Sequence, residues 1–167
     1  PPKAGQRPPY ADPQSPDDPG RLDSDAIEAV REEAWPQVRN ADEMHEALMG
    51  LGVVTAREVR ENGWADWLQK LVKAHRTTRL EPPTAGSVVT LTQGDGRGLW
   101  VAAERLPQLH AVFPGAPLKP AIEAPAEYVQ EPWTREEALT ELLRSRLTGL
   151  GPVSARVLAS DLSLPRG

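Results

Sequence analysis

Residues 41–81 have the most regular hydrophobic pattern in the chain. In the second half of this stretch, apolar positions recur at i, i+3, i+4, i+7 and i+8, a spacing that predicts an amphipathic helix. These apolar positions are Trp64, Trp67, Leu68, Leu71 and Val72. Lys70 and Lys73 fall on the opposite face. The pattern therefore predicts a helix with an apolar inner face and a basic outer face.

Two earlier segments also have helical periodicity and capping signals. The first is capped by Asp23 or Ser24 and ends at about Trp35, just before a proline. The second follows Asn40, which we expect to cap the helix while the carboxylate of Glu43 bonds back to the cap.

Residues 56–62 are predicted to form a short turn, capped by Thr55, between the second helix and the Trp64 helix. After His75 the residues become β-branched and the period changes from helical to extended. Three segments are predicted as strands: residues 77–81, 87–92 and 99–101.

The C-terminal third contains one more helix, then prolines, then a final helical pattern. Residues 103–113 predict a short helix. Beyond the prolines, Thr134 and Glu137 have the spacing of a capping box. The helix that follows is predicted to bury one row of leucines, and a further helix capped by Ser154 is predicted to bury two more. The two sets are Leu139, Leu142, Leu143 and Leu147, then Leu158 and Leu162.

These elements predict an α+β fold that is mainly α. Residues 21–113 are expected to form a winged-helix module, a helix-turn-helix followed by a small antiparallel sheet, and residues 133–167 the first helices of a second, truncated one. Residues 1–20 hold seven of the 18 prolines and are expected to be a disordered linker. Residues 114–132 are a second proline-rich connector. We expect the chain to be a segment of a longer protein.

Composition narrows the function classes. The net charge of −5 argues against a general nucleic-acid coat, but residues 51–100 hold seven basic and five acidic residues, which permits a local phosphate contact. The chain has no cysteine, which excludes disulfides and thiolate metal sites. No apolar run approaches the roughly 18 residues of a membrane span. We expect a cytoplasmic protein with no membrane partner.

Catalytic and metal motifs are incomplete. His45 and Glu46 begin a zinc-protease pattern, but Met49 stands where the second histidine ligand is required, so a surface histidine is the better interpretation. The glycines of residues 94–98 do not open a helix and are typical of a hairpin tip. We therefore predict no catalytic residue and no metal ligand.

The basic residues around the Trp64 helix are the remaining functional candidates. Arg57 and Arg60 belong to this set, although Asp66 and Gln69 dilute its positive charge. A solvated helix face is the competing interpretation. The residues predicted to contact nucleic-acid phosphates are Lys70, Lys73, His75, Arg76 and Arg79.

Three stretches, residues 31–52, 99–107 and 136–155, resemble the C-terminal region of bacterial Lhr (large helicase-related) superfamily 2 helicases. Members of that family are ATP-dependent helicases that translocate 3′ to 5′ on single-stranded DNA. Their C-terminal region consists of tandem winged-helix modules and is associated with oligomerisation and DNA repair. The resemblance implies a non-catalytic segment with no cofactor of its own, while the parent protein uses ATP and Mg²⁺.

The resemblance implies three kinds of partner: DNA, neighbouring winged-helix modules and a second copy of the chain. Two alternatives to DNA binding stay open. One is a purely oligomeric role through surfaces that carry Trp35, Trp133 and the connectors. The other is part of a DNA glycosylase-like domain, although the Gln-x-Gln motif of that activity is absent from the chain.

Overall fold

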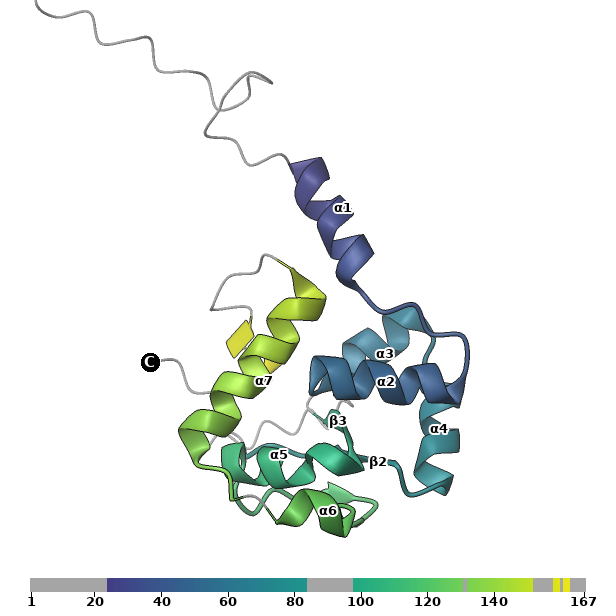
Figure 1. The fold of residues 1–167 in the computed structure, drawn as a ribbon. Coiled ribbons are helices and arrows are strands. Elements are labelled where there is room, and N and C mark those ends of the chain that lie inside the picture. The colour runs from purple at the N-terminus through teal and green to yellow at the C-terminus, as the bar shows by residue number, and fades with distance from the viewer. Residues whose placement is uncertain (1–23, 84–97, 131, 152–157, 160, 163–167) are drawn as a thin grey trace, which may run out of the picture.

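The computed structural model describes residues 24–83, 98–130, 132–151, 158–159 and 161–162. In this part of the chain the fold is mainly helical with a small antiparallel sheet, as predicted (Figure 1). Helix α1 (Ser24–Ala34) has no buried residue, and it contacts the rest of the fold at helix α7. None of the described helices is long and apolar enough to cross a membrane.

Helix α2 (Ala41–Leu51) begins where the capping signals predicted. The Asn40 side chain accepts a hydrogen bond from the Glu43 backbone N–H at 2.8 Å. The reciprocal bond differs from the prediction, because the Glu43 carboxylate accepts from the backbone N–H of Arg39, one residue earlier, at 2.7 Å. The cap thus fixes both the helix start and the chain that enters it.

A strand and two helices follow α2. Strand β1 (Val54–Thr55) leads into α3 (Ala56–Asn62), where Thr55 and Glu58 form a complete capping box. Gly63 ends α3 in the left-handed conformation, which glycine adopts without a Cβ penalty. Helix α4 (Ala65–Lys73) follows and corresponds to the helix predicted from Trp64 onward.

The sheet has the order β1-β3-β2-β4, with every pair antiparallel. Strands β2 (Thr77–Leu80) and β3 (Leu99–Ala102) confirm two predicted strands; the predicted strand over residues 87–92 lies outside the described residues. The sequence did not predict β1 or β4 (Leu118–Lys119), because two residues are too few to show a period.

After β3, a 3₁₀ turn η1 (Ala103–Arg105) continues into α5 (Leu106–Val112). The proline-rich stretch then contains β4 and the short helix α6 (Ala126–Val129). Helix α7 (Arg135–Leu150) begins at the predicted Thr134–Glu137 capping box.

Two apolar clusters hold the fold together. One joins α2, α3 and α4 around Met44, Leu48 and Leu68. The other joins the sheet to α5 and α7, and both Leu158 and Leu162 are buried in it as predicted. The division into modules at residues 21–113 and 133–167 stays a prediction, but α7 packs on both α2 and α5.

The inner face of α7 differs from the predicted row of leucines. Leu142 is fully buried and Leu139 and Leu143 are partly buried, but Leu147 is 44% exposed. The row that faces inward is Ala138, Leu142, Arg146 and Gly149. Periodicity missed this row because it includes a charged residue and a glycine, which a hydrophobic pattern does not count.

Candidate nucleic-acid interface

Helix α4 has the amphipathic character that the sequence predicted. Leu68 and Leu71 are buried on its inner side, and Trp64, which precedes it, is only 3% exposed. Lys70 and Lys73 are exposed on the other side. The apolar face therefore anchors α4 to α2 and leaves its basic face to solvent.

Lys70, the first of the two lysines of α4, lies against an aromatic ring. The ammonium of Lys70 lies 4.9 Å from the centre of the Trp67 ring, within the range of a cation–π contact. Among the described residues, neither Lys70 nor Lys73 has a carboxylate within ion-pair distance. Both charges are therefore available to an anion.

His75 lies in the turn between α4 and β2. Its φ of 56° is in the left-handed region, and its backbone N–H donates to the Val72 carbonyl at 3.0 Å. The residue is exposed beside the end of α4. Its clear role in the structure is to end the helix and turn the chain into the sheet.

Arg76 and Arg79 have acidic neighbours that the sequence could not indicate. The Arg76 guanidinium binds the Asp42 carboxylate of α2 at 2.8 Å, and Arg79 lies 3.3 Å from Glu81. Glu81 also contacts Lys119 of β4 at 3.1 Å. These carboxylates reduce the positive charge that the two arginines present to solvent.

Lys119 is a basic neighbour that sequence reasoning missed. It pairs with Arg79 across β2 and β4, although the two residues are 40 positions apart. The Arg79 side chain also fills the space beside Gly98. A Cβ added to Gly98 would lie 2.4 Å from the Cδ atom of Arg79. The sheet thus brings Arg79 and Lys119 together, and both contact the carboxylate of Glu81.

Arg57 and His45 both lie beside acidic side chains. Arg57 lies 3.6 Å from Asp161. His45 is not the surface histidine that was predicted, because its ring nitrogen is 2.9 Å from Glu104 and its side chain is 14% exposed. Within the described residues, no three histidine, aspartate or glutamate side chains gather as a metal site.

The tryptophans serve mainly in packing. Trp35 stacks on Trp64, with ring centres 5.6 Å apart and planes 9° from parallel. The indole N–H of Trp35 donates to the Asn62 side chain at 3.1 Å. These two contacts hold the segment after α1 against the end of α3 and the start of α4. Trp35 is therefore not free to form an assembly surface. Trp133, by contrast, is 38% exposed.

Comparisons of the chain with protein-family models, with curated proteins and with solved structures find no match.

Proposed function

We propose that the winged-helix module expected over residues 21–113 contacts the phosphate backbone of DNA, within a non-catalytic segment of a helicase-related repair protein. The order of elements supports this proposal: helix, short strand, two helices, then two paired strands. A second helix of a helix-turn-helix is the element that approaches nucleic acid. Helix α4 occupies that position here.

The observation that carries the proposal is the pair of exposed lysines on α4. Lys70 and Lys73 are one helical turn apart and lie beside the turn into β2. Phosphate contacts from lysine position a protein on nucleic acid without reading the sequence. We therefore infer binding that depends on salt and little on base sequence.

The acidic neighbours set the expected strength of binding. Asp42 is 84% exposed, and its carboxylate competes with a phosphate for Arg76, although exposed ion pairs contribute only about 0–1 kcal/mol. With two to four phosphate contacts, the logarithm of the binding constant should fall with the logarithm of salt concentration with a slope of about −2 to −4.

Fluorescence anisotropy with single-stranded and duplex DNA across a salt series tests the proposal. The variant Lys70→Gln/Lys73→Gln should bind more weakly and reduce the slope by about 2. The matched control Arg39→Gln/Arg135→Gln removes the same charge from two exposed positions elsewhere. Equal weakening in both variants, or absence of binding at low salt, would refute the α4 contact.

A second function, self-association, is favoured by a separate observation. Apolar side chains of α1, α6, α7 and the turn before α7 are exposed to solvent: Val30, Tyr128, Val129, Trp133 and Leu147. Light scattering over a range of concentrations tests this function. A mass of about 18 kDa at every concentration would exclude self-association by this chain.

A further inference from the structure

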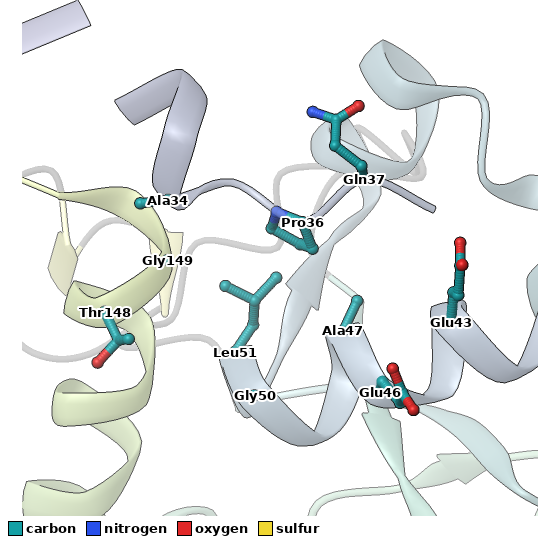
Figure 2. A pocket seen from close by; sticks show the side chains of 10 residues that line it. All are labelled: Ala34, Pro36, Gln37, Glu43, Glu46, Ala47, Gly50, Leu51, Thr148 and Gly149. Carbon is teal, nitrogen blue, oxygen red and sulfur yellow. The ribbon is translucent and has the colours of Figure 1, made fainter. Parts of the chain in front are cut away.

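A pocket lies where the ends of three helices meet, away from the basic face of α4. It is about 330 Å³ in volume, at the lower end of the range for ligand sites. Figure 2 shows Leu51 and Ala47 of α2 pointing toward Pro36, with Gly149 of α7 on one side and the acidic residues of α2 on the other. The pocket thus combines an apolar floor with an acidic edge.

Close packing of two helices forms the floor. At Gly149, an added Cβ would lie 2.1 Å from a methyl carbon of Leu51, so α7 approaches α2 more closely than alanine would allow. At Gly50 the situation is reversed, because an added Cβ would meet no heavy atom within 4 Å. Gly149 is needed for packing, whereas Gly50 leaves open space in the pocket wall.

The acidic edge consists of Glu43 and Glu46. The Glu43 carboxylate already accepts a hydrogen bond from the backbone of Arg39 and lies 3.7 Å from its guanidinium. Glu46 is exposed and has no ion-pair partner among the described residues. The free carboxylate at this edge is therefore that of Glu46.

The surrounding segment has the same sign of charge. Residues 24–51 hold seven acidic and two basic residues, a net charge of −5 that equals the charge of the whole chain. Clefts lined by one sign of charge attract the opposite sign. Charge complementarity therefore favours a cationic occupant.

We propose that this pocket receives an arginine side chain from an extended peptide segment of a partner protein. The aliphatic stem of arginine would lie along Ala47, Leu51 and Pro36, and its guanidinium would form a two-pronged hydrogen bond with Glu46. Arginine suits the site better than lysine because its planar head is less strongly hydrated and matches a carboxylate in shape. The site is separate from the proposed DNA contact on α4.

An NMR titration of the ¹⁵N-labelled 167-residue chain tests this site. The probe is a nine-residue peptide with one central arginine and only glycine and serine elsewhere. Its control is the same peptide with citrulline, which is neutral and has nearly the same shape. We expect the arginine peptide to shift the amide signals of Ala47, Gly50, Thr148 and Gly149, and the citrulline peptide to bind about tenfold more weakly.

Two variants locate the contact. Glu46→Gln should weaken binding about tenfold by removing the charge, and Gly50→Leu should abolish binding by filling the pocket. Glu127→Gln, at an exposed position on α6, should change the affinity less than twofold. The same spectra report whether each variant is folded.

Four results would overturn the proposal: no shift at any peptide concentration, equal binding of the citrulline peptide, equal weakening by Glu127→Gln, and full binding by a folded Gly50→Leu variant.

Discussion

The guanidinium of Arg146 on α7 binds the carboxylate of Glu58 on α3 through two parallel hydrogen bonds, each 3.1 Å long. Arg146 is fully buried and Glu58 is 5% exposed. A third bond, 2.9 Å long, goes from Arg146 to the carbonyl of Val53. Because Glu58 is also half of the capping box of α3, this pair connects the start of α3 to α7.

The first prediction concerns this pair. Arg146→Met leaves the Glu58 carboxylate buried without its partner, so the free energy of unfolding should fall by about 3–5 kcal/mol. Arg144→Met is a control on the same helix, because the Arg144 side chain is exposed and pairs with the exposed Glu141. This substitution should lower the free energy of unfolding by less than about 1 kcal/mol. Urea unfolding measures both. Similar losses in the two variants would contradict a special role for the buried pair.

The second prediction concerns the contact of α2 with α7. Gly149→Ala would place a methyl group against Leu51 and should lower the free energy of unfolding by about 1–3 kcal/mol. In the double variant Gly149→Ala/Leu51→Ala, the loss should be smaller than the sum of the single losses, because the obstructing side chain is gone. Thermal and urea unfolding measure these losses. If the loss in the double variant equals the sum of the two single losses, the added methyl group does not collide with Leu51.

The third prediction has the opposite sign at a neighbouring glycine. Gly50 is in the last turn of α2, and space is open around it. Gly50→Ala should therefore raise the free energy of unfolding by about 0.5–1 kcal/mol, the usual difference between glycine and alanine in a helix. Calorimetry should show a higher melting temperature. A lower melting temperature would mean that the space at Gly50 is filled.

The fourth prediction concerns the acidic partner of Arg76. Asp42→Asn removes the carboxylate that Arg76 binds, so Arg76 becomes free to contact a phosphate. DNA binding should strengthen, and the salt slope should steepen by about 0.9. Anisotropy titrations measure both quantities.

Glu127→Gln is the control for that change, because it alters the net charge equally at an exposed residue of α6. It should leave the salt slope unchanged. Adding Arg76→Gln to the Asp42→Asn variant should remove the gain in DNA affinity. A gain that persists without Arg76 would show that net charge, rather than this arginine, controls binding.

The fifth prediction concerns the pH dependence of stability at Arg105. This side chain donates to the Gln108 side chain at 2.8 Å and to the Met49 carbonyl at 2.7 Å. Burial lowers the pKa of the Arg105 guanidinium from its ordinary value, and the nearby Glu141 carboxylate acts in the opposite direction. A base whose pKa is lower in the folded state binds fewer protons there than in the unfolded state. Its contribution to stability therefore rises with pH between the two values.

In Arg105→Lys the same burial acts on a side chain whose ordinary pKa is only about 10.4. The variant should be less stable than the wild type at neutral pH, because lysine cannot make both hydrogen bonds. The difference should narrow as the pH rises toward about 10.4. Urea unfolding of both proteins from pH 7 to 10 checks this; a difference that stays constant or widens would contradict it.

Short-range signals in the sequence predicted α1, α2, α4, α5, α7 and two of the strands; α6 was expected to be part of a connector and α3 to be a turn. Thr55 with Glu58, and Thr134 with Glu137, set helix starts because each cap involves residues three positions apart. The amphipathic period of α4 determined which residues face inward and left Lys70 and Lys73 outside. Such features depend on neighbours within one or two helical turns, so they can be predicted without a fold.

Only the tertiary structure decided which charged side chains form ion pairs. Arg76 and Asp42 are 34 residues apart, and Arg146 and Glu58 are 88 apart, so no local pattern links either pair. The same holds for Gly149, whose role depends on the approach of α7 to α2. Ion pairs and close packing depend on distances through space, and the folding of distant segments sets those distances.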